Sequence, residues 1–154
     1  MSLPAGSLVR VANQPAAGLG VLTGTTVGTL GSNTNGTTIE TAGTYGTRII
    51  SLTASSSDTV ARDVFVYILR GGSTVIPIGL VTVAASSGNA TGASRFAVDF
   101  LNGTNIPGLP LDNTGRQYIS LLGGDVLRAT TLTASVTAAT SIFIQAMALD
   151  YLAP

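Results

Sequence analysis

The 154-residue sequence contains no cysteine, no histidine, no tryptophan and no lysine. Without cysteine there is no disulfide, no thiolate nucleophile and no zinc-finger spacing. Without histidine the chain lacks the commonest general base and the commonest transition-metal ligand. These absences argue against nucleophilic enzymes and against transition-metal centres.

Charge is also scarce. Charged residues make up 9% of the chain, against about 25% in an ordinary soluble domain. Seven arginines balance seven acidic residues, so no basic excess exists to attract nucleic acid. Because surface charge keeps soluble proteins apart, we expect this chain to bury much of its outside against copies of itself or a larger partner.

The opening residues lack the basic start and apolar core of a secretory signal. No apolar run approaches the roughly 18 residues of a membrane span. We therefore expect synthesis in a cytoplasm and no association with a membrane.

The clearest local pattern is a hairpin over residues 60–83. An unbroken apolar run, Val64–Leu69, is followed by Gly71-Gly72 and then by a second β-branched run. Two glycines between strand-like runs favour a tight antiparallel turn, since both accept positive φ. Alternation puts Val64, Val66 and Ile68 on one face and Phe65, Tyr67 and Leu69 on the other. A strand that is apolar on both faces belongs at the centre of a two-layer protein or at a subunit contact.

Further short runs complete an all-β pattern. In Thr47–Ala54, the alternation predicts that Ile50 and Leu52 share one face. Other strand-like runs are Arg95–Leu101, Gln117–Leu122, Asp125–Thr133 and Ser141–Tyr151. About eight strands after residue 36, with frequent turn signals, predict an antiparallel β-sandwich. The long proline-containing connection over residues 102–113 favours a Greek-key or jelly-roll crossover.

Residues 1–36 form a region of their own, rich in Gly, Thr, Asn and Ala, with Arg10 as the only charge. The composition fits either an unstructured tail or an arm that becomes ordered on a neighbouring subunit. Its scattered Leu and Val favour the arm. We therefore divide the chain into an N-terminal arm, 1–36, and a sandwich domain, 37–154.

Signals for enzyme chemistry are thin. Asp58 with Asp63, or Asp112 with Asp125, could form the carboxylate pair of a glycosidase. Isolated aspartates near turns more often bond nearby backbone amides. We expect no enzyme activity, no cofactor and no metal.

The arginines are informative as a set, because most lie in or beside a predicted strand. They could be solvated residues that protect strand edges from aggregation. Alternatively, they could pair with aspartates across subunits, since the planar guanidinium suits a carboxylate better than lysine does.

Three stretches carry a resemblance: Tyr45–Ile49 entering a strand, Val64–Arg70 followed by two glycines, and Leu109–Leu111 leading to Gly124–Arg128. The ending Ala148–Tyr151 fits the same pattern. Over residues 40–151 the chain resembles the head decoration, or cement, proteins of tailed bacteriophages, which have a β-sandwich fold.

The resemblance implies a homo-oligomer, commonly a trimer, on the outer surface of a virion, where it would bridge adjacent major capsid subunits. The competing interpretation is a receptor- or carbohydrate-binding β-module of a phage tail or adhesin, although aromatic residues are only 5% of the chain. The residues that we expect at an interface are Leu8, Val9, Arg10, Val11, Arg48, Arg62, Arg70, Arg128 and Tyr151.

Overall fold

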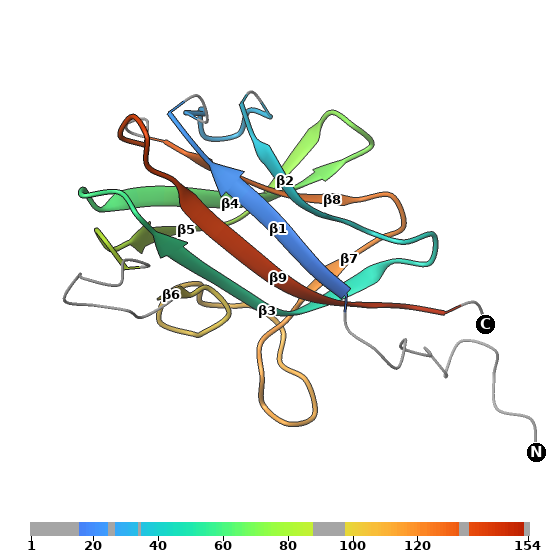
Figure 1. Ribbon diagram of the computed structural model, residues 1–154. Coiled ribbons are helices and arrows are strands. Elements are labelled where there is room, and N and C mark those ends of the chain that lie inside the picture. Colours follow the sequence, from blue (N-terminus) through green and yellow to red (C-terminus); the bar gives the residue numbers. More distant parts are fainter. Residues whose placement is uncertain (1–15, 25–26, 34, 88–97, 133–135, 153–154) are drawn as a thin grey trace, which may run out of the picture.

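The computed structural model describes residues 16–24, 27–33, 35–87, 98–132 and 136–152. Within these ranges the chain forms nine strands and no helix (Figure 1). The strands are β1 (Ala16–Leu22), β2 (Thr37–Thr41), β3 (Thr47–Ser56), β4 (Arg62–Arg70), β5 (Thr74–Val83), β6 (Val98–Asp99), β7 (Ile119–Leu121), β8 (Val126–Thr131) and β9 (Ile142–Asp150). The predicted all-β class is confirmed, with eight strands after residue 36.

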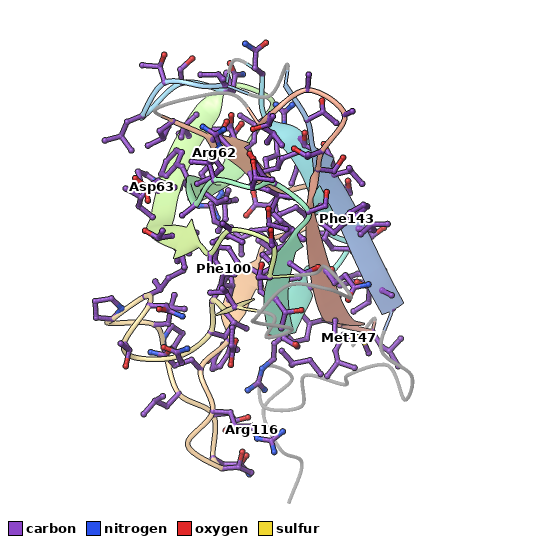
Figure 2. All side chains as sticks on the ribbon, turned by 60° about the vertical axis from the view of Figure 1, so that its left-hand side comes forward. Arg62, Asp63, Phe100, Arg116, Phe143 and Met147 are labelled. Carbon is purple, nitrogen blue, oxygen red and sulfur yellow. The ribbon has the colours of Figure 1, made fainter. Side chains whose placement is uncertain are left out.

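The strands form two antiparallel sheets that pack face to face as a β-sandwich (Figure 1). One sheet has the order β1-β9-β3-β6, with β7 also paired to β3, and the other has the order β2-β8-β4-β5. Of these neighbours, only β4 and β5 follow each other in the described sequence. Figure 2 places Phe100 between the two layers, and its side chain is fully buried.

The predicted hairpin is β4 and β5, and the predicted alternation along β4 is confirmed. Val64, Val66 and Ile68 lie in the core between the sheets. Phe65, Tyr67 and Leu69 form a second buried cluster on the opposite face, where the Phe65 and Tyr67 rings stack with centroids 5.2 Å apart. The strand is therefore buried on both faces, as its continuous apolar run indicated.

The predicted pairing of Ile50 with Leu52 on one face of β3 is wrong. Ile49 lies opposite Ala148 of β9 and Ser51 lies opposite Met147, so Ile50 is an extra residue in a β-bulge. A bulge shifts the alternation by one residue. Ile49 and Leu52 are consequently both buried, while Ile50 is 37% exposed on the outer face.

Part of the expected N-terminal arm belongs to the sandwich, because β1 pairs with β9 along its whole length. Gly18 and Gly20 of β1 face inward, where β2 of the other sheet approaches very closely. A Cβ atom at Gly18 would lie 2.4 Å from the carbonyl oxygen of Ile39, and one at Gly20 would lie 2.9 Å from Cγ1 of Ile39. Residues 1–15 of the expected arm lie outside the described residues.

Another part of the same region contacts the outer face of the four-stranded sheet. Val27 forms a parallel bridge to Thr131 of β8. The Asn33 amide donates to the Gly72 carbonyl (3.4 Å), at the β4–β5 turn. Gly36 lies so close above Tyr67 that a Cβ atom there would clash with the tyrosine hydroxyl. The aromatic cluster of β4 is thus covered by the chain's own residues.

Candidate functional site

Arg62, predicted at an interface, is bound within its own chain. Its Nε donates to Oδ2 of Asp58 at 2.8 Å, and Asp58 is fully buried. Thr137 adds two more donors to the same carboxylate, through its backbone N–H (3.0 Å) and its hydroxyl (2.6 Å). Burial alone would raise the pKa of Asp58, but these hydrogen bonds outweigh it and hold the pKa well below its usual range.

Arg70 also has an internal partner. Its Nε and Nη2 bind the Asp125 carboxylate at 2.9 and 2.7 Å, which is the two-pronged geometry that suits a guanidinium. The same carboxylate accepts the backbone N–H of Leu122 and so orders the β7–β8 turn. The hydrogen bonds from Arg70 lower the pKa of Asp125, against the effect of burial.

Arg48 lies 3.3 Å from Oδ2 of Asp112 and 4.0 Å from the centroid of the Tyr118 ring. The Thr114 hydroxyl and the backbone N–H of Arg116 donate to Asp112 as well, and together with Arg48 they lower its pKa to about 2. This cluster fastens the loop after residue 111 to β3.

Arg128 donates to the backbone carbonyls of Asn33 and Gly36, over the outer face of the four-stranded sheet. The backbone N–H of Tyr151 donates to the Gly46 carbonyl at 3.0 Å, and its side chain is half-buried. Leu8, Val9, Arg10 and Val11 lie outside the described residues. Arg48, Arg62, Arg70 and Arg128 therefore occupy separate places, each bound to its own chain, and share no common surface.

The aspartates weighed as glycosidase pairs are occupied in the same way. Asp58, Asp112 and Asp125 each bind an arginine, and Asp63 accepts the hydroxyl of Thr82 at 2.6 Å. Among the described residues, no group of three or more acidic side chains is placed to hold a metal ion. In the described part of the chain, no helix is long and apolar enough to cross a membrane.

The most distinctive surface is the outer face of the five-stranded sheet. Strand pairing arranges nine outward residues in a grid of three rows across β1, β9 and β3. The rows are Ala17–Met147–Ser51, Leu19–Gln145–Thr53 and Val21–Phe143–Ser55. None of the nine carries a charge, and we call them the charge-free face.

Large apolar side chains of the charge-free face lie open to solvent. Leu19 is 55% exposed, Phe143 41% and Met147 38%. Figure 2 shows Phe143 and Met147 on β9, on the side turned away from the other sheet. The three residues that β3 contributes to this face, Ser51, Thr53 and Ser55, are polar but carry only hydroxyl groups.

A second exposed apolar area lies at the end of the sandwich where the β2–β3 turn meets the β7–β8 turn. Cβ atoms built at Gly46 and Gly123 would clash with the carbonyl oxygens of Leu121 and Thr44, so these two turns pack directly on each other. The side chains of Tyr45, Leu122 and Leu152 are exposed here. We call these three residues the apolar end.

Two hollows mark the outside of the five-stranded sheet. One, of about 430 Å³, lies on the charge-free face between Leu19, Thr53 and Met147. The other, of about 700 Å³, runs from Ile50 and Ser51 of β3 to Asp99 of β6 and to the loop residues Leu111 and Arg116. Ser51 lines both.

No family model, no curated protein and no solved structure matches this chain.

The charge-free face was not predicted from the sequence, although β9 carries its signal. Phe143, Gln145 and Met147 alternate with the buried Ile142, Ile144 and Ala146. Both sets are largely apolar, so alternation alone does not say which one faces the core. The pairing of β9 between β1 and β3 decides it.

Proposed function

We propose that this chain is a structural protein of a bacteriophage virion, which decorates the capsid by bridging adjacent major capsid subunits. The observation that supports this best is the presence of two separate exposed apolar areas, the charge-free face and the apolar end. A protein that links two neighbours needs at least two contact areas. The resemblance to phage cement proteins supplies the identity of the partner.

The arrangement of charged residues also supports a partner contact that depends on apolar area. Of the five arginines that the structure describes, three form ion pairs with aspartates of their own chain, and a fourth binds backbone carbonyls. An arginine that is already paired with an aspartate of its own chain contributes little to the attraction of a charged partner protein. Recognition through buried area, which falls off little with salt, suits such a surface.

Each contact area is small, so one copy alone would bind weakly. A decoration protein acts as many copies on a repeating lattice, where a second contact on the same copy becomes effectively intramolecular. One area that docks on a capsid subunit and a second that contacts a neighbouring copy can therefore link two capsid subunits more strongly than either contact would alone. In this proposal the apolar end docks on the capsid.

The test is co-expression with the major capsid protein of the same phage genome, followed by sedimentation of the assembled shells. We expect the chain to sediment with the shells, and we expect Tyr45→Ser combined with Leu152→Ser to lower its occupancy at least about tenfold. Burial of one large apolar side chain stabilises a contact by about 1.5–3 kcal/mol, which is itself about tenfold or more.

The matched control is Leu80→Ser, which removes an exposed leucine from β5 on the other sheet. We expect its occupancy to match that of the wild-type chain. Equal losses in the control and in the double variant would contradict docking by the apolar end. A wild-type chain that stays in the supernatant at every salt concentration would contradict the capsid function itself.

The second candidate function is a receptor- or carbohydrate-binding module, and the 700 Å³ hollow favours it. Its volume lies within the range of small-molecule sites, and Asp99, Asn102, Arg116 and Gln117 supply polar groups beside apolar ones. A glycan array tests this function directly. Binding that Arg116→Ala abolishes would favour the module over the capsid protein.

A further inference from the structure

We infer that the charge-free face is a self-association surface, on which a second copy of this chain packs face to face about a two-fold axis. This deepens the proposed function by naming one partner of one surface. It uses a different area from the apolar end, so the two ideas can fail separately.

The composition of the face favours a second copy over a charged partner. In a two-fold contact every residue meets either its own counterpart or a residue of the same patch. A patch with one sign of charge would then repel itself, and like charges held together are costly. The nine residues of this face carry no charge, so a second copy places no like charges within the face itself. Two charged residues flank the face: Arg48, two residues before Ile50 on β3, is paired with Asp112, and the exposed Asp99 of β6 lies beside Thr53.

The shape of the face also fits a second sheet. Two β-sheets pack about 10 Å apart with their side chains interdigitated. The exposed Leu19, Phe143 and Met147 project from the face, and the 430 Å³ hollow beside Thr53 and Gln145 can receive a projecting side chain of the other copy. The same face therefore offers both the projections and the space that they enter.

Gln145 lies at the centre of the grid, flanked by Leu19 on β1 and Thr53 on β3. Any two-fold axis that lies in the plane of the face and passes through this centre places Gln145 opposite Gln145 of the second copy. Two carboxamides are self-complementary, because each has an N–H donor and a carbonyl acceptor. The central pair can thus satisfy its own hydrogen bonds inside an apolar surround.

The area of the face sets the strength of the contact. Three strands about 4.8 Å apart and five residues at about 3.4 Å each cover on the order of 240 Å² in plan. Standard interfaces bury about 800 Å² per partner, so free copies should associate only at high concentration. On a capsid, where copies are held close together, the same contact would be far more occupied and would link neighbouring copies in pairs.

The experiment measures sedimentation equilibrium of the full chain at concentrations up to about 1 mM, a range that detects millimolar dissociation constants. We expect reversible association to an even number of copies. Gln145→Glu alone and Gln145→Lys alone should each weaken association at least tenfold, because like charges then face each other. An equimolar mixture of the two variants should restore or exceed wild-type association, since opposite charges now meet across the axis.

Circular dichroism of both variants confirms that they are folded, which is expected because Gln145 is exposed. Leu80→Glu, on the other sheet, is the control and should leave the association unchanged. A wild-type chain that is monomeric or trimeric over the whole range overturns the inference. So do variants that associate like wild type, and so does a mixture that fails to restore association. Capsid binding is read in a separate assay, so its loss or retention does not affect this result.

Discussion

At the scale of single residues, the chain stabilises its loops with buried carboxylates. Asp58 accepts hydrogen bonds from the backbone N–H of Val60, from Arg62 and from both donors of Thr137. The network ties the β3–β4 loop to the loop that precedes β9. Removing one partner of a buried ion pair leaves the other without compensation, which costs more than the pair contributes.

We predict that Asp58→Asn lowers the free energy of unfolding by about 3–5 kcal/mol, the range for breaking a buried pair from one side. The substitution keeps the size of the side chain but removes the charge that Arg62 faces. Urea unfolding followed by circular dichroism measures the loss. Asp63→Asn is the matched control, because Asp63 is partly exposed and binds only the Thr82 hydroxyl among the contacts described; its loss should stay under about 1 kcal/mol. Equal losses at the two positions would refute the role of the Asp58 network.

The arginines also show what residue types alone can and cannot predict. Arginine–aspartate pairing across subunits was one of two interpretations of the sequence, and the described residues contain three such pairs, all within one chain. The sequence does not say whether the two partners belong to one chain. Asp125 is 55 residues from Arg70, and only the pairing of β4 with β8 brings them together.

At the scale of elements, the glycines of β1 mark a place where the two sheets approach closely. Residues 16–22, which include Gly18 and Gly20, fell within the predicted N-terminal arm, and no strand was predicted there. The structure places both where β2 leaves no room for a side chain. Glycine also marks sites where another backbone approaches closely, and a single sequence does not distinguish that use from a break.

We predict that Gly18→Ala destabilises the sandwich by about 1–3 kcal/mol, the usual cost of overfilling a packed site. For a chain of this length that corresponds to a fall of roughly 2–12 °C in the melting temperature. The added Cβ would lie 2.4 Å from a backbone oxygen, so β1 must move away from β2.

Gly103→Ala is the control for this substitution, since its nearest neighbour would be 4.0 Å from the new Cβ. We expect its melting temperature to stay close to that of the wild-type chain. A Gly18→Ala variant that melts with the wild type would show that β1 and β2 are not held as closely as described.

The two central strands explain why some of the fold was predictable. Alternation along β4 was read correctly because β4 itself contains no extra residue; the irregularity in this pair lies on β5, where Val66 faces Gly79 and Tyr67 faces Pro77. In β3 the extra residue is Ile50, and the prediction failed from that point. A bulge is set by the partner strand, here β9, and leaves no mark in the apolar pattern of its own strand.

At the scale of the whole molecule, six of the twelve charged residues that the structure describes form three ion pairs, and the nine residues of the charge-free face carry no charge. The composition alone predicted a chain that is incomplete without partners. The composition does not show where the charge-free face lies, because its position depends on which strands become neighbours. Sheet order places β9 between β1 and β3 and so collects the nine uncharged residues into one surface.

The ionisable residues of the chain predict how its stability depends on pH. The chain has no histidine, so no side chain with an ordinary pKa changes its charge between pH 5 and 8. Asp58, Asp112 and Asp125 have pKa values below the ordinary value in the folded state, about 2 in the case of Asp112. A lowered folded-state pKa stabilises the fold above the unfolded-state value of about 3.9, and that stabilisation is lost as the pH falls through the folded-state pKa.

We therefore expect the urea midpoint to be constant from about pH 8 to pH 5 and to fall steeply only below about pH 4. The Asp58→Asn variant, already less stable, should show a shallower fall below pH 4, because one of the carboxylates that take up protons on unfolding is gone. A midpoint that drops between pH 7 and pH 5 would mean that a group other than these aspartates controls acid stability. If the urea midpoint of Asp58→Asn falls with pH as steeply as that of the wild-type chain, Asp58 is not held ionised by Arg62 and Thr137.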